Sequence, residues 1–227
     1  MKITEEQLAK ILDKDRTGDE QWKWHISAVK DMTDTYISEA KSKPFNGWDP
    51  KIVDDLLSHD NVIAPISRMA LTEKEVAMIK DYFYTITPIL KNIANSKEKT
   101  GGDYKALDAQ IQKYSKGAHL LTLTFRYVVA MQPDIFSAIM NDDMYDNRHG
   151  FFALTEKFID SQGLPKARHP IDRHNNWYDD NIALTGWVKK ITGRSTEVTT
   201  YALHIVHVLR ELEANEQGFA AKYKGIV

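Results

Sequence analysis

The chain has 227 residues, of which 42% are hydrophobic and 27% are charged. This balance is typical of a folded globular protein and excludes an intrinsically disordered chain. The 30 basic and 32 acidic residues nearly cancel, which excludes a surface that is basic all over, and the lack of cysteine excludes disulfides, thiolate zinc sites and a cysteine nucleophile.

Residues 1–71 are expected to form an N-terminal helical lid and connector. Thr4 and Gln7 have the spacing of a capping box, which predicts a short first helix over about 5–14. Apolar residues three or four positions apart then predict a second helix from about residue 19 to residue 40. Three prolines interrupt the remainder of this region, where a short helix is expected at 51–58.

Two tryptophans lie near the start of the second expected helix. Trp22 falls on the apolar stripe of that helix, whereas Trp24 does not. Trp24 is therefore expected either to be an exposed recognition residue or to be covered by the first helix.

The strongest structural signal is a pair of apolar seams in the middle of the chain. Thr72 and Glu75 form a second capping box, and apolar residues then alternate three- and four-residue steps over about 72–95. The same spacing recurs over about 104–131, beyond a polar loop that contains two glycines. The sequence therefore predicts an all-α fold, a single-domain helical bundle built on this long antiparallel hairpin.

Shorter helices are expected after the hairpin, at about 134–140, around Phe151–Ile159, at about 177–191 and at about 197–214. The segment 163–177 separates two of them. It contains two prolines and has no clear periodicity, which predicts the longest irregular loop of the chain.

This loop carries the side chains that nucleic-acid binding needs. Basic groups can neutralise phosphates, amides can bond to base edges, and an indole offers a stacking face. The candidate residues are Lys166, Arg168, Arg173, His174, Asn175, Asn176 and Trp177. The alternative is an ordinary surface loop whose charges are balanced by neighbouring aspartates and whose tryptophan is buried.

A second candidate is a metal site on the last expected helix. His204, His207 and Glu211 can share one face of that helix and offer imidazole and carboxylate ligands. The alternative is that the two histidines form hydrogen bonds at the edge of an apolar stripe. The sequence contains no G-x-x-x-x-G-K-[ST], G-x-S-x-G or H-E-x-x-H motif, so we expect no nucleotide cofactor and no common hydrolase centre.

Two segments resemble a known family. Phe125–Phe136 contains an apolar helix, a proline, an acidic residue and an aromatic residue in that order. It is similar to helical regions that precede the motor of McrB-like modification-dependent restriction ATPases, and Tyr201–Leu212 resembles the helix that often closes such regions. The resemblance implies a module that recognises DNA, or that positions the recognising part, in a phage-defence enzyme whose motor and nuclease lie elsewhere.

These observations predict a helical nucleic-acid recognition module of a restriction or phage-defence system that is not catalytic alone. Its expected partners are DNA and a separate motor or nuclease subunit. A protein interaction or regulatory module is the first alternative, and a metal-dependent hydrolase is the second. No apolar run is long enough to cross a bilayer and no signal peptide is evident, so we expect a cytoplasmic protein without a membrane partner.

Overall fold

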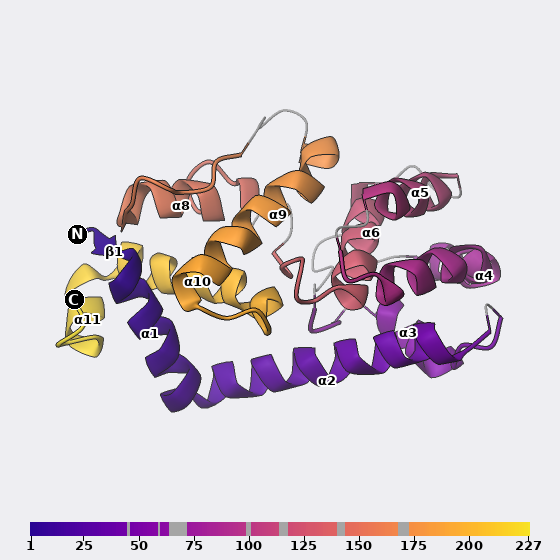
Figure 1. Cartoon of the computed structure of the whole chain (residues 1–227), viewed down its shortest axis with the longest axis horizontal. Helices are drawn as coiled ribbons and strands as arrows, with labels where there is room; N and C mark the ends of the chain where they lie inside the picture. The colour runs from indigo at the N-terminus through magenta and orange to yellow at the C-terminus, as the bar shows by residue number, and fades with distance from the viewer. Residues whose placement is uncertain are drawn as a thin grey trace. The chain divides into compact units, whose positions relative to one another are not determined.

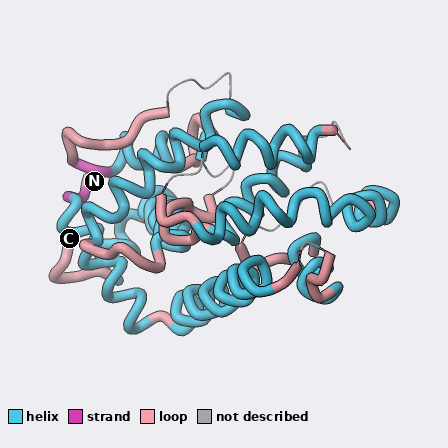
Figure 2. Tube along the Cα trace, turned by 45° about the vertical axis from the view of Figure 1, so that its right-hand side comes forward, coloured by secondary structure: helices cyan, strands magenta, loops and turns pink. Residues whose placement is uncertain are grey.

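The computed structural model describes residues 1–44, 46–58, 60–63, 72–98, 101–113, 118–139, 144–167 and 173–227, without the side chains of 118–121 and 173–176. Helices dominate the described residues, as Figure 2 shows, and the expected all-α class is confirmed. None of the helices in this part of the chain is both long enough and apolar enough to cross a membrane.

The elements follow one another along the chain as labelled in Figure 1. The helices are α1 (Glu5–Gly18), α2 (Glu20–Ser42), α3 (Pro50–Leu57), α4 (Glu73–Asn95), α5 (Gly101–Gln112), α6 (Ala118–Met131), α8 (Phe151–Phe158), α9 (Arg173–Thr192), α10 (Val198–Ala214) and α11 (Glu216–Lys222). Two strands of two residues each, β1 (Ile3–Thr4) and β2 (Ile159–Asp160), pair in parallel with Ile3 opposite Ile159.

The described residues group into two compact units, whereas the sequence predicted one domain. Unit 1 consists of Met1–Ser27 together with Phe136–Val227, and unit 2 consists of Ala28–Ile135. The expected lid and connector, residues 1–71, is thus divided between the two units. In unit 1, α10 packs against α8, α9, α11 and α1, and in unit 2, α4 packs against α5 and α6.

Both capping boxes form as the sequence predicted. At the start of α1, the Thr4 hydroxyl accepts a hydrogen bond from the backbone of Gln7, and the Gln7 side chain accepts one from the backbone of Thr4. Thr72 and Glu75 make the same reciprocal pair at the start of α4. Two otherwise unpaired backbone donors are satisfied at each helix start, which fixes where the helix begins.

The expected second arm at 104–131 is two helices. The first is α5 and the second is α6, and residues 114–117 between them lie outside the described part. The two helices pack against each other as well as against α4. One continuous helix would not allow this, because residues of a helix that are far apart in sequence lie far apart along its axis.

Unit 2 buries an arginine in its interior. The Arg126 side chain has no exposed surface, and its Nη1 donates hydrogen bonds to the carbonyl oxygens of Leu56 and Ser58 at 2.7 and 2.8 Å. These carbonyls lie at the C-terminal end of α3, where a helix leaves its last carbonyl groups without partners. Burial lowers the pKa of Arg126 to about 10, so the guanidinium stays charged at neutral pH. Arg126 therefore ties α6 to the end of α3.

The C-terminal part of the chain differs from expectation in three places. No helix forms among the described residues of the expected segment 134–140, which end at Ile139. The helix expected from residue 177 begins at Arg173, and α11 was not expected at all.

Candidate functional site

The predicted nucleic-acid loop is shorter than expected. Residues 163–167 are irregular, and Arg168 lies outside the described residues. Arg173, His174, Asn175 and Asn176 belong to the first turn of α9, and their side chains are likewise outside the described part. Lys166 is exposed.

Trp177 does not offer the stacking face that the sequence suggested. Its side chain has 0% exposed surface, and its ring lies nearly parallel to that of Phe136 at 5.9 Å. The indole Nε1 donates a hydrogen bond to the carbonyl oxygen of Ile139 at 3.3 Å. A fully buried indole cannot stack on a nucleic-acid base, so this expected role is corrected: Trp177 is a core residue of unit 1.

Lys166 lines a cavity of about 660 Å³ between β2 and the residues before α8. The charges around this cavity are mixed. Lys2 and Lys166 face three carboxylates of the lining, those of Asp146, Glu156 and Asp160. Such a balance does not favour the phosphates of a nucleic acid.

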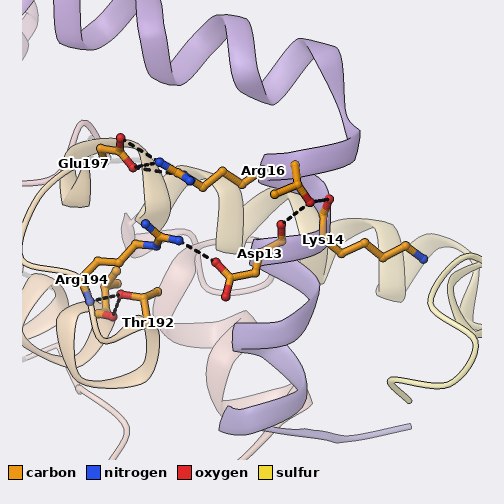
Figure 3. A network of polar contacts seen from close by, with 8 residues as sticks. Asp13, Lys14, Arg16, Thr192, Arg194 and Glu197 are labelled. Carbon is orange, nitrogen blue, oxygen red and sulfur yellow. Dashed lines mark hydrogen bonds and ion pairs between the residues drawn. The ribbon is translucent and has the colours of Figure 1, made fainter.

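Two basic residues at or just beyond the C-terminal end of α9 are paired with acids of α1. Lys190 Nζ lies 3.3 Å from Glu5 Oε2, and Arg194 Nη2 lies 2.9 Å from Asp13 Oδ1. Figure 3 shows the Arg194 pair together with a second ion pair, in which Arg16 of α1 binds both carboxylate oxygens of Glu197. These cations hold unit 1 together, which leaves less positive charge for an anionic partner.

The alternative metal site of His204, His207 and Glu211 is not supported. Among the described residues, no group of three or more histidine, cysteine, aspartate and glutamate side chains could hold a metal ion. His204 is 1% exposed and faces Asp15, while Glu211 forms an ion pair with Lys222 at 2.8 Å. His204 thus forms the hydrogen bond that the alternative interpretation expected.

A different site lies where α1, α2 and α10 meet in unit 1. Trp24 on α2 is 64% exposed, the largest exposed fraction among the large hydrophobic side chains of the described residues. It borders a pocket of about 360 Å³. We call this the Trp24 pocket, and its main lining residues are Asp19, Trp22, Trp24, His25, His207 and Glu211.

Aromatic rings form one wall of the Trp24 pocket. Trp22 stacks on His204 with ring centres 3.8 Å apart and meets His207 edge to face at 5.5 Å. The ring centre of His25 lies 5.6 Å from that of Trp22 and 6.5 Å from that of Trp24. These contacts fix Trp22, whereas most of Trp24 stays in solvent.

A buried polar network lies beneath this wall. The His204 Nε2 donates to Asp15 Oδ2 at 3.0 Å, and the Tyr223 hydroxyl donates to the same oxygen at 2.9 Å. Burial opposes ionisation of Asp15, but the hydrogen bonds from His204 and Tyr223 outweigh it and lower the pKa of the carboxyl. Burial also lowers the pKa of His204, so a neutral imidazole faces an ionised carboxylate.

The rim of the Trp24 pocket is acidic. Asp19 caps α2, and its Oδ1 accepts hydrogen bonds from the backbone of Gln21 and Trp22 at 2.9 and 3.3 Å. Glu211 of α10 pairs with Lys222 of α11, and the two side chains are 40% and 42% exposed. Lys222 Nζ also lies 4.9 Å from the centre of the Tyr223 ring.

A second pocket with an exposed aromatic residue lies in unit 2. Tyr84 of α4 is 52% exposed and borders a pocket of about 350 Å³, which also involves Trp48, Asp54, Lys80 and Phe83. Lys80 and Asp54 form an ion pair at its edge. We call it the Tyr84 pocket; it provides a matched reference for the Trp24 pocket.

Comparisons with protein-family models, with curated proteins and with solved structures found no match for this chain. The function is therefore argued from the residues of the site. The sequence had singled out Trp24, but it gave no sign that Glu211 and Lys222 lie beside it. Helix α11, which carries Lys222, has no apolar periodicity long enough to predict it.

Proposed function

We propose that the protein is an interaction module that binds a partner protein through the Trp24 pocket. The observation that carries the proposal is a tryptophan that is 64% exposed beside a pocket whose other tryptophan is fixed by stacking. Tryptophan is among the residues most enriched at the energetic centres of protein interfaces.

The exposed surface of Trp24 has an energetic cost that a partner would remove. A tryptophan side chain buries roughly 200 Å² when it is fully covered. Since 64% of Trp24 is exposed, covering it would contribute about 3 kcal/mol to a complex at about 25 cal/mol per Å². An isolated exposed aromatic residue is ordinary, but one that borders a pocket forms a continuous recognition surface.

DNA recognition in a restriction or phage-defence system is the rival proposal. Among the described side chains of the predicted loop, Lys166 is the one that supports this rival. Trp177 is buried, and the side chains of residues 168–176 lie outside the described part. Lys166 also shares its cavity with three carboxylates.

Affinity capture with matched variants separates these proposals. The immobilised protein and its variants Trp24→Ala and Tyr84→Ala are exposed to extracts of the cells that natively produce it, and bound proteins are quantified by mass spectrometry. We expect a companion protein that the wild type and Tyr84→Ala retain and that Trp24→Ala loses by at least about tenfold. Equal capture by Trp24→Ala and wild type would remove the proposal.

A second measurement tests the rival directly. Binding to single- and double-stranded DNA is titrated at low and moderate salt. Salt-sensitive binding that Lys166→Ala weakens and Trp24→Ala leaves unchanged would favour DNA recognition over the Trp24 pocket.

A further inference from the structure

We infer that the Trp24 pocket receives a cationic side chain, lysine or arginine, of its partner. This inference rests on the proposed function and names the chemistry that the pocket would select. It follows from the combination of indole rings with carboxylates around one cavity of about 360 Å³. That volume lies at the lower end for ligand pockets and suits one long side chain better than a large ligand.

The aromatic wall is the first argument. The faces of indole rings attract cations, and tryptophan does so better than tyrosine or phenylalanine. Trp22 and Trp24 both line the cavity, and Trp24 is 64% exposed. The aliphatic part of a lysine or arginine side chain can cover such a ring while its charged end reaches the rim.

The carboxylates are the second argument. Asp15, Asp19 and Glu211 line the cavity, and Lys222 is the lysine that faces them. Asp15 is already bonded to His204 and Tyr223, so Asp19 and Glu211 are the groups that can meet an incoming charge. Among the described residues, the helix cap uses one carboxylate oxygen of Asp19, Oδ1.

The ion pair between Glu211 and Lys222 does not block this use. Both side chains are about two fifths exposed, and exposed ion pairs contribute little to stability because water and salt screen them. Lys222 Nζ lies 2.8 Å from Glu211 Oε2 and 4.9 Å from the centre of the Tyr223 ring. The rim thus already holds one ammonium group, that of Lys222, beside a carboxylate.

Short peptides test the charge preference without knowledge of the partner. The probes are acetyl-Gly-Xaa-Gly-amide, in which Xaa is lysine, arginine, norleucine or glutamate. Norleucine keeps the aliphatic chain of lysine and lacks its charge. Binding to the full chain is followed by NMR at the indole Nε1–H resonance of Trp24, which is assigned with Trp24→Phe.

We expect saturable shifts with the lysine and arginine peptides, and affinity at least about fivefold weaker for norleucine. Asp19→Asn should weaken lysine binding by about two- to fivefold, because asparagine caps a helix equally well but removes the charge. Asp54→Asn is the matched control at the Tyr84 pocket and should leave the affinity unchanged.

Equal affinity for lysine and norleucine, or no shift with the lysine peptide, would overturn the inference. Either result leaves the capture experiment with Trp24→Ala as an independent test of partner binding. Loss of the companion in that experiment together with equal lysine and norleucine affinity would identify the pocket as an apolar docking site.

Discussion

Unit 2 buries the guanidinium of Arg126, whereas unit 1 buries the carboxylate of Asp15. Arg126 is 0% exposed and is held by two carbonyl oxygens, and Asp15 is 5% exposed and is held by His204 and Tyr223. In each unit, neutral hydrogen-bonding groups contribute to stabilising a buried charge.

The two charges serve different ends. Arg126 satisfies the terminal carbonyls of a helix within the core of unit 2. Asp15 lines the Trp24 pocket and joins α1, α10 and the residue after α11 beneath it. The comparison teaches that a buried charge can close a core in one place and shape the base of a surface pocket in another. Substitutions in the two networks should therefore differ in size and in pH dependence.

The largest effect is expected from Arg126→Met. Methionine fills a similar volume but leaves the Leu56 and Ser58 carbonyls without a donor, so the free energy of unfolding should fall by about 3 kcal/mol. Urea unfolding measures this change.

Arg210→Met is the matched control for the buried arginine. Arg210 also donates two hydrogen bonds to a carbonyl, that of His149, but both are exposed. Their removal should cost less than about 1 kcal/mol. If the two variants lost equal stability, burial of Arg126 would not be the cause of its contribution.

A smaller effect, which depends on pH, is expected from His204→Gln. Since burial lowers the pKa of His204 in the folded protein, the unfolded chain takes up a proton below about pH 6.5 that the folded protein binds less readily. Wild-type stability should therefore decline as the pH falls from 7 to 5, by at most about 1.4 kcal/mol per pH unit from this group. Glutamine can still donate to Asp15 and should flatten the decline.

Urea midpoints at pH 5, 6 and 7 measure this dependence. An unchanged slope in His204→Gln would show that other groups set the pH dependence.

The smallest effect is expected from Arg16→Gln. Arg16 and Glu197 form a bidentate ion pair, but their side chains are 32% and 21% exposed. Solvent screens such a pair, so its loss should lower the free energy of unfolding by less than about 1 kcal/mol. A loss comparable with that of Arg126→Met would contradict the distinction between buried and solvent-screened charges.

The sequence predicted helix starts well where local chemistry defines them. The capping boxes at Thr4 and Thr72 begin α1 and α4 as expected. It failed at Trp177, whose apolar stripe is interrupted at Asp180 and Asn181. Both side chains are fully buried, and hydrogen bonds offset the cost of their burial. Asp180 accepts one from Tyr145, and Asn181 binds the backbone of Ser137. When buried polar residues form hydrogen bonds with residues far along the chain, the local sequence pattern no longer indicates that the helix face lies in the core.

The candidate site could be predicted only in part. Trp24 departs from the apolar stripe of α2, and this local signal identified it as a candidate for exposure. Its charged surroundings include residues almost 200 positions away, Glu211 on α10 and Lys222 on α11. No local periodicity relates such distant residues, so the pocket emerges only from the tertiary structure.

The division of unit 1 into two separate stretches of sequence sets an order for its assembly during synthesis. The ribosome makes residues 28–135, all of unit 2, between the two stretches. At roughly 5–20 residues per second this takes on the order of 10 s. Until then α1 lacks the helices that cover Leu8 and Ile11 in the finished protein. Unit 2 can thus fold before α9 and α10, which pack against α1, have been synthesised.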